Sequence, residues 1–414
     1  MARISEQVIE QIRSTADIVE VISGYVELKK RGRNFFGLCP FHGEKTPSFS
    51  VNSERQIYKC FGCSVGGGVI NFIMEIEGME FISAVKHLAN QYSIEIQIDD
   101  VPGQAKNFIT QLFDLNETTS NIFFNNLGTE EGRKVLTHLE LRGIKRDIIK
   151  KFRLGYSLKK KDALLSTFRK NGVNGDVMKQ SGLFIDTKAG YMDRFNGRIM
   201  FSIPNSSGKI AAFAGRVFES DDPAKYINSP ETPLYNKSKI LYGLHESKHA
   251  IRESKSAIVV EGYLDFLQLY QSGIHNIVAV SGTAFTLQHA LQLKRFCNDI
   301  YLAYDGDSAG KSAAIRAGYV LLRSGLSIFI VNIPTGMDPD DWVKQDGKKP
   351  FLEAIHNSEK LLPFHYKNYV GDTSSTAGKA AFINDVLTEI AQITNPVDRE
   401  LQQIQLLRLF PQVT

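Results

Sequence analysis

Short apolar runs alternate with amphipathic stretches between residues 255 and 333 of this 414-residue chain. The apolar runs read SAIVV, NIVAV, DIYLAY and SIFIVNI, and helical patterns such as YLDFLQLYQSG and AGKSAAIRAGYVLLRSG separate them. Strands that are apolar throughout bury both faces, and strands that alternate with helices are typical of βαβ units. The pattern therefore predicts a parallel α/β sheet.

The remainder of the chain lacks this regular alternation. Residues 1 to about 100 combine short β-like pieces, such as GYVEL and PSFSV, with a helix predicted from Val69 to Gln91. The polar, turn-forming DDVPGQ predicts a linker, and a mixture of helical and strand patterns follows it up to about residue 245. Beyond about residue 350 the pattern is purely helical. We therefore predict four parts, with boundaries at 1–103, 104–250, 251–345 and 346–414.

The composition is that of a core-forming globular chain, with 43% hydrophobic and 23% charged residues. A net charge of +4 is compatible with a nucleic-acid partner without requiring one. The first residues show no signal-peptide pattern, and no uncharged apolar run reaches membrane-spanning length. We therefore expect a cytoplasmic protein with no membrane partner, in which the four cysteines do not form disulfides.

Three of the cysteines and one histidine form two pairs with two-residue spacers, namely Cys39/His42 and Cys60/Cys63. Each pair can bind one side of a tetrahedral ion, and thiolate with imidazole suits zinc. The segment between the pairs has hairpin character, as in a zinc ribbon. The alternative is buried free thiols with a chance histidine, which the repeated spacing makes a poorer explanation. We predict one structural zinc ion.

Basic and aromatic residues alternate around this cluster. The cations are Lys29, Lys30, Arg31, Arg33, Lys45 and Lys59, and the aromatic residues are Phe35, Phe36, Phe41, Phe49 and Phe61. Phosphate contacts and base stacking make this combination suitable for single-stranded nucleic acid. A solvated charged face over a small phenylalanine core is an equally good explanation for most of these residues.

Carboxylates follow three of the predicted parallel strands. SAIVV ends at Glu261, DIYLAY leads to Asp305 and Asp307, and SIFIVNI leads to Asp338, Asp340 and Asp341. Ligands of open α/β sheets gather beyond the carboxyl ends of the strands, and oxygen-only ligands are those that Mg²⁺ prefers. For any single acid the alternative is a solvated loop or a helix N-cap, which is a role that Asp307 could fill.

The same region contains GDSAGKS, which nearly matches a phosphate-binding P-loop. A P-loop has four residues between its glycines, whereas only three separate Gly306 from Gly310. Asp307 also lies where an anion would bind. A divalent-metal site is therefore the better interpretation.

These motifs resemble a known family. EGYLD followed by YDGDSAG is similar to the TOPRIM domain of primases, topoisomerases and some nucleases, and CPFHGEKTPSF…YKCFGC before it resembles the bacterial DnaG-type DNA primases. RFNGRIMFSI, AFAGRV and KYINSPETPLYNKS resemble polymerase-domain motifs of that family, so the resemblance covers essentially the whole chain. It implies an N-terminal zinc ribbon, a mixed α+β subdomain, a TOPRIM sheet and C-terminal helices.

The resemblance also implies an enzyme that copies single-stranded DNA into short RNA primers from ribonucleoside triphosphates. Its metal site, for Mg²⁺ or Mn²⁺, would consist of Glu261, Asp305 and Asp307 with Asp338 and Asp340, and Asp265 lies nearby. Arg198, Arg216, Lys225, Asn228 and Lys237 match positions of the family's template and nucleotide surface. It implies activity at the nucleoid and replication fork. The family normally continues into a C-terminal domain that binds the replicative helicase, and this sequence ends at PQVT, so we expect either a fragment or the absence of that contact.

Three other functions remain open at this stage. A TOPRIM nuclease or topoisomerase would use the same acids, a helicase–primase fusion would need a genuine P-loop, and a zinc adaptor for single-stranded DNA would leave the carboxylates without a role.

Overall fold

The computed structural model describes residues 6–79, 81–92, 94, 103–188, 190–219, 222–282 and 284–410. The chain forms two compact units, Met1–Thr110 and Gln111–Thr414. The finer boundaries at residues 103, 250 and 345 stay predictions.

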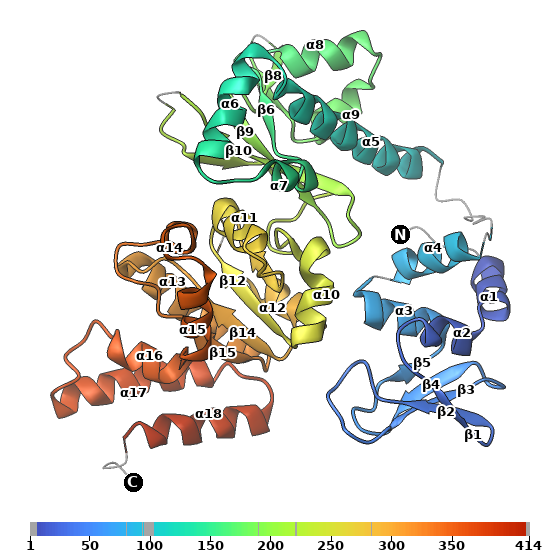
Figure 1. Ribbon diagram of the computed structural model, residues 1–414, viewed down its shortest axis with the longest axis vertical. Coiled ribbons are helices and arrows are strands. Elements are labelled where there is room, and N and C mark those ends of the chain that lie inside the picture. Colours follow the sequence, from blue (N-terminus) through green and yellow to red (C-terminus); the bar gives the residue numbers. More distant parts are fainter. Residues whose placement is uncertain are drawn as a thin grey trace. The chain divides into compact units, whose positions relative to one another are not determined.

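Within its described residues up to Ile94, the N-terminal unit contains an antiparallel five-stranded sheet and four helices (Figure 1). The strands are β1 (Lys29–Arg31), β2 (Asn34–Gly37), β3 (Phe49–Asn52), β4 (Ile57–Cys60) and β5 (Gly66–Gly67), and the helices are α1 (Glu6–Thr15), α2 (Ile18–Ser23), α3 (Val69–Glu77) and α4 (Phe81–Gln91). Strands β3 and β4 form the hairpin expected between the two ligand pairs. The predicted strand at GYVEL is wrong, because the first strand begins only at Lys29.

The single helix predicted from Val69 to Gln91 is also wrong. Gly78 adopts a left-handed conformation with φ of 64°, and its N–H donates to the carbonyl of Met74, which ends α3. Glycine is the residue that reaches this conformation at least cost, so the helix ends here although the apolar pattern continues. The second helix, α4, then starts at Phe81.

The first part of the larger unit is built on an antiparallel sheet of order β11-β10-β9-β6 with a separate hairpin, β7–β8. Its strands are β6 (Gly155–Ser157), β7 (Phe184–Thr187), β8 (Gly190–Asp193), β9 (Arg198–Pro204), β10 (Ile210–Val217) and β11 (Tyr226–Asn228). The helices are α5 (Gly103–Asn126), α6 (Glu130–Leu141), α7 (Arg146–Lys151), α8 (Ala163–Lys170) and α9 (Gly175–Gln180).

The second part contains the predicted parallel sheet, in the order β13-β12-β14-β15-β16. Strands β12 (Ser256–Val260), β13 (Ile277–Ala279), β14 (Asp299–Leu302) and β15 (Ser327–Ile330) are parallel. Around them lie α10 (Leu244–Ser254), α11 (Tyr263–Gln271), α12 (Leu287–Leu293), α13 (Ser308–Arg323), α14 (Pro339–Asp346) and α15 (Lys348–His356). The alternation of strand and helix predicted from the sequence is therefore confirmed.

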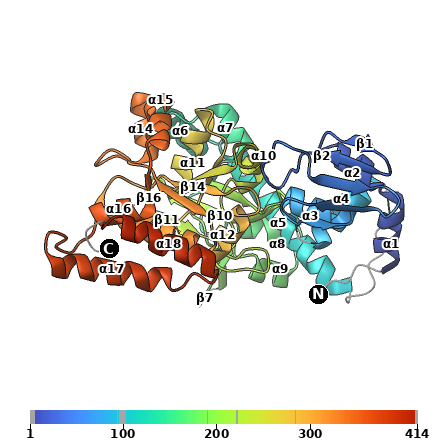
Figure 2. The ribbon, with the colours of Figure 1, turned by 90° about the horizontal axis from the view of Figure 1, so that it is seen from below.

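The C-terminal part is mostly helical, with α16 (Leu361–Lys367), α17 (Thr376–Ile390) and α18 (Pro396–Arg408). Figures 1 and 2 show α17 and α18 side by side. The expectation of a purely helical end is wrong in one detail. Strand β16 (Glu359–Lys360) pairs antiparallel with β15 and closes that edge of the sheet.

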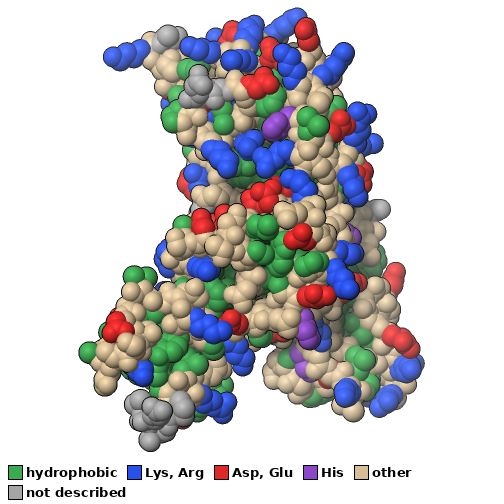
Figure 3. Space-filling view, turned by 60° about the vertical axis from the view of Figure 1, so that its left-hand side comes forward, with side chains coloured by type: hydrophobic (Ala, Val, Ile, Leu, Met, Phe, Trp, Pro, Cys, Tyr) green, Lys and Arg blue, Asp and Glu red, His purple; other side chains and the backbone are tan. Residues whose placement is uncertain are grey.

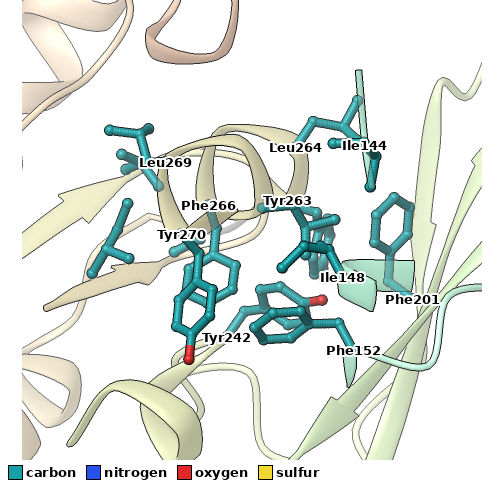
Figure 4. Packing of buried hydrophobic residues seen from close by; sticks show 14 of the residues in the cluster. Ile144, Ile148, Phe152, Phe201, Tyr242, Tyr263, Leu264, Phe266, Leu269 and Tyr270 are labelled. Carbon is teal, nitrogen blue, oxygen red and sulfur yellow. The ribbon is translucent and has the colours of Figure 1, made fainter. Parts of the chain in front are cut away.

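Successive residues of β12 pack into two different cores. Ile258 and Val260 belong to a cluster with α11, α14 and α15, whereas Ala257 and Val259 belong to a cluster with α13 and α16–α18. The first cluster also includes Ile144, Phe152 and Phe201 of the antiparallel part, and Figure 4 shows these residues around the aromatic side chains of α11. One continuous core therefore holds the antiparallel sheet against the parallel one.

Candidate active site and metal centres

The two ligand pairs of the N-terminal unit converge as predicted. The Sγ atoms of Cys39 and Cys63 are 3.8 Å apart, and Cys60 Sγ lies 3.6 Å from Nδ1 of His42. All four ligand atoms lie within 4.8 Å of one another. A tetrahedral zinc ion with Zn–S of about 2.3 Å and Zn–N of about 2.0–2.1 Å implies S–S edges of about 3.8 Å and S–N edges of about 3.6 Å. The donor set therefore has the size and chemistry that fit zinc.

Contacts outside the four donors orient them. The second ring nitrogen of His42, Nε2, lies 3.2 Å from the carboxylate of Glu44, which also accepts the backbone N–H of Cys39 at 2.8 Å. Metal-bound histidines commonly have such a carboxylate partner. Cys60 Sγ accepts the N–H of Gly62 at 3.3 Å, and a Cβ at Gly62 would lie 2.5 Å from the His42 ring. Glycine is therefore required at this position.

The thiols differ in acidity. Burial raises the pKa of Cys39, whereas for Cys60 the effect of burial is outweighed by hydrogen bonds from Ser48 and from the N–H groups of Cys63 and Gly62, which lower its pKa to about 7. Sulfur atoms this close together repel one another when ionised, unless a cation lies between them.

The phenylalanines around the zinc cluster have two different environments. Phe49 is fully buried and stacks on Tyr58 with 5.3 Å between the ring centroids, so it belongs to the core. Phe61, between two of the predicted ligands, is 73% exposed. All six predicted cations are exposed. The core explanation thus holds for Phe49, while Phe61 is available to a ligand.

In the larger unit the carboxylates meet at one edge of the parallel sheet, as expected for strands that run in the same direction. Glu261 directly follows β12, Asp305 follows β14, and Asp338 ends the loop that follows β15. Together with Asp265 and Asp340, these residues line a cleft of about 540 Å³. Burial, followed by the charges of neighbouring acids, raises the pKa values of both Glu261 and Asp305.

Asp265 is influenced by three other acids of this group. It is 8% exposed, and burial together with the charges of Asp338, Asp305 and Asp340 raises its pKa to about 8. Its carboxylate accepts the N–H of Gly262 at 3.0 Å and that of Asp340 at 3.3 Å. Mutual repulsion of this kind is relieved by a cation, so the donor set suits a divalent metal ion.

Two of the predicted acids are also helix N-caps. Asp307 accepts the N–H of Gly310 at 2.7 Å, and Asp338 accepts that of Asp341 at 2.7 Å, and each cap uses one carboxylate oxygen. Among the described residues, the acids whose oxygens gather within 4.8 Å are Asp338, Asp340 and Asp341. Asp307 is exposed at the start of α13 and does not line the cleft, so its role as a ligand stays a prediction.

The glycines of the near-P-loop have a different structural explanation. A Cβ at Gly306 would lie 2.2 Å from the carbonyl oxygen of Pro334, and one at Gly310 would lie 2.3 Å from that of Asp305. Both glycines therefore allow close backbone approach within the sheet edge. Lys311 does not line the cleft.

The predicted basic residues fall into three environments. Arg216 and Lys225 line the same cleft as the acids, from β10 and from the residue before β11. Asn228 also lines it, but its amide already donates to the carbonyl of Ser281 at 2.9 Å and accepts from Tyr263 Oη at 3.1 Å. Lys237 is half-buried outside the cleft lining.

Arg198 is 2% exposed, unlike a surface contact residue. Its guanidinium donates to the carbonyls of Gly215 at 3.2 Å and Ala224 at 3.0 Å and pairs with Asp222. Arg198 therefore supports the segment that carries Lys225. Its role as a direct template contact stays a prediction.

Two arginines of the cleft were not predicted from the sequence. Arg142 follows α6 and lies 3.6 Å from Asp340, and Arg316 projects from α13. Neither belongs to a recognisable motif, because only the tertiary fold brings them to the acids. Figure 3 shows one face of the molecule, on which Lys and Arg side chains gather next to a group of acidic ones.

Comparison with known proteins identifies the family. Family models match in chain order: a CHC2 zinc finger at residues 4–104, the N-terminal domain of the DNA primase catalytic core at 122–248, and a Toprim-like domain at 258–343. The DNA primase of Listeria monocytogenes is 38% identical over 99% of this chain and 68% of its own length. The chain belongs to the DNA primase family.

Other primases agree with this identification. That of Geobacillus stearothermophilus is 36% identical over 99% of this chain and 70% of its own length. The structure of the zinc-binding and RNA polymerase domains of Aquifex aeolicus primase matches with a TM-score of 0.65 and 31% identity, over 99% of this chain and 98% of that one. A DnaG primase catalytic domain bound to single-stranded DNA matches 73% of this chain and 99% of its own, with a TM-score of 0.65 and 31% identity.

Primases are DNA-directed RNA polymerases, which are nucleotidyltransferases, and they synthesise short RNA primers for DNA replication. The predicted function and multidomain α/β fold are thus confirmed, whereas the topoisomerase, nuclease and adaptor alternatives are not supported. The zinc-finger and Toprim-like matches also support zinc and a divalent metal ion as cofactors. Within the described ranges, no helix has both the length and the apolarity needed to cross a membrane.

Proposed function

We propose that the cleft at the edge of the parallel sheet is the nucleotidyl-transfer centre of this primase. Glu261, Asp305, Asp307, Asp338 and Asp340 would hold Mg²⁺ or Mn²⁺, with single-stranded DNA as the template and ribonucleoside triphosphates as substrates. One observation carries the proposal: carboxylates from three strand ends line the same cleft of about 540 Å³ as Arg216 and Lys225. A polyanionic substrate with bound divalent ions needs both signs of charge in one cleft.

The bound ion would lower the pKa of the attacking ribose 3′-hydroxyl and stabilise charge on the α-phosphate. The protein's own groups orient the reactants. Lys225, which is exposed, and Arg216 would pair with phosphate oxygens of template or nucleotide. Asn228 would keep β11, and with it Lys225, close to the acids through its contacts with Tyr263 and Ser281. Lys237 would contact the same nucleic acid outside the cleft.

We further propose that Cys39, His42, Cys60 and Cys63 hold one structural zinc ion. All four tetrahedral positions would then be taken by protein atoms, which leaves no position for a reacting group. The surrounding cations and the exposed ring of Phe61 would hold the template through phosphate contacts and base stacking. We infer that the enzyme acts at the replication fork in the cytoplasm, where single-stranded template is exposed.

The direct test is primer synthesis. The purified protein is incubated with single-stranded DNA, four ribonucleotides and Mg²⁺ or Mn²⁺, and the products are resolved by size. We expect short RNA from the wild type and almost none from Asp305→Asn, while Lys311→Ala, a charge change beside the same sheet edge but outside the cleft, keeps its activity. Full activity of Asp305→Asn would place the reaction elsewhere.

A further inference from the structure

Arg142 is a cation of the cleft that lies close to a buried acid. Its Nη2 is 3.6 Å from Oδ2 of Asp340, whose side chain is only 4% exposed, while Arg142 itself is 29% exposed and lines the cleft. This distance exceeds that of a good hydrogen bond, so the two side chains attract each other electrostatically but no hydrogen bond fixes their relative orientation. A second cation, Lys344, lies 3.7 Å from the other oxygen of Asp340.

The backbone next to Arg142 is held by contacts with α11. The side chain of Gln271 on α11 donates to the carbonyl of Gly143 at 2.7 Å and accepts the N–H of Lys145 at 3.0 Å. Ile144, between them, is 2% exposed and packs next to Leu264 (Figure 4). The turn after α6 is thus anchored to the helix that follows Glu261, which keeps Arg142 at the acids.

A divalent ion bound at these acids would change the electrostatic environment of Arg142. It would repel the guanidinium and neutralise the negative charge of Asp340. A triphosphate bound with the ion would offer new anionic oxygens in the same cleft. Guanidinium suits phosphate because its planar donors can form two parallel hydrogen bonds.

We propose that Arg142 exchanges partners during the reaction, pairing with Asp340 in the metal-free enzyme and with a phosphate of the incoming nucleotide once the metal is held. This inference rests on the proposed function of the cleft. Lys344 supplies a contrast, because it faces Asp340 and Asp341 but does not line the cleft. Arg142 should therefore weaken metal binding and strengthen nucleotide binding, whereas Lys344 should affect only the metal.

These two effects can be measured separately. Trp342, the single tryptophan of the chain, lies on α14 two residues after Asp340, so its fluorescence should report Mn²⁺ binding. Affinity for ATP at saturating Mn²⁺ is measured by isothermal titration calorimetry on the 414-residue chain. We expect Arg142→Gln to bind Mn²⁺ about two- to tenfold more tightly, as removal of one nearby cation implies. It should bind ATP about 10- to 100-fold more weakly, as loss of a charged hydrogen bond implies.

The matched control, Lys344→Gln, should also bind Mn²⁺ more tightly but should bind ATP like the wild type. Arg142→Lys should restore the wild-type Mn²⁺ affinity and recover ATP binding only in part. A structural role for Arg142 would instead weaken both ligands in Arg142→Gln, and unchanged ATP affinity would remove it from the nucleotide site. Either result overturns the proposal. Primer synthesis by the wild type tests the function of the cleft independently of these variants.

Discussion

Asp265 is predicted to destabilise the metal-free protein at neutral and alkaline pH. Its pKa is raised from 3.8 to about 8, mainly by burial and then by Asp338 and Asp305. The folded state therefore holds a proton that the unfolded state has already lost between these two values, so stability falls as the pH rises from about 4 to about 8. Each pH unit corresponds to about 1.4 kcal/mol, which gives an upper limit of about 6 kcal/mol well above pH 8 and about 5 kcal/mol at pH 8 itself.

The variant Asp265→Asn removes this charge but keeps only one of the two acceptor oxygens. Asp265 accepts N–H groups from Gly262 and Asp340, and loss of one buried hydrogen bond costs about 1–3 kcal/mol. The net expectation is a gain of about 2–4 kcal/mol at pH 8. This gain should shrink as the pH is lowered towards 4, because the wild-type carboxyl is then neutral as well.

Urea unfolding followed by Trp342 fluorescence measures this quantity for the larger unit, since the chain has no other tryptophan. The buffer contains no added divalent ions and no chelator, so that zinc is retained. Asp346→Asn, which changes an exposed carboxylate on the same helix as Trp342, serves as the control. If Asp265→Asn is no more stable than the wild type at pH 8, or if the difference is the same at pH 5 and pH 8, the carboxyl of Asp265 does not destabilise the folded state. Added Mg²⁺ should stabilise the wild type more than the variant.

The remaining predictions concern the zinc, the acids and the basic surface. Elemental analysis should find about one zinc per chain. Cys60→Ser should lose the zinc and speed hydrogen exchange in residues 1–110 while the larger unit stays folded. A wild-type protein that holds no zinc after purification without chelators would contradict the zinc site. Asp307→Asn should lower the rate of primer synthesis by ~10²–10³-fold because a charge that stabilises the transition state is lost, and Lys311→Ala should have a much smaller effect. An inactive Lys311→Ala together with an active Asp307→Asn would instead favour a phosphate-binding loop. Lys225→Ala should weaken single-stranded DNA or nucleotide binding regardless of sequence and flatten its salt dependence, and Lys237→Ala should do the same; an unchanged salt slope in both variants would make these lysines merely solvated.

Much of the fold follows from local sequence. The alternation of apolar strands and amphipathic helices from 255 to 333 predicted the parallel sheet, because each strand of such a sheet is buried on both faces and leaves a continuous apolar run. The zinc site was equally accessible, since two-residue spacers determine which donors can share one ion. The acids at strand ends could be grouped because the ends of parallel strands meet at one edge.

Several features depended on tertiary contacts and could not be predicted. Two-residue strand β16 pairs with β15 only because the chain returns to that edge, and two residues carry no periodic signal. The helix predicted through Gly78 breaks there because the glycine adopts a left-handed conformation, which a continuing apolar pattern does not reveal.

Donor type and spacing in the sequence predict which residues can bind metals, and the order of the motifs predicts the order of the domains. Only the folded chain shows which cations lie near the acids. Arg198 matches a family motif yet is buried beneath the segment of Lys225, whereas Arg142 belongs to no motif and lies 3.6 Å from Asp340. The physical reason is that a pair of metal donors is a local property of a few neighbouring residues. The electrostatic potential at a carboxylate, in contrast, depends on charges from distant elements, which come together only because they share a core.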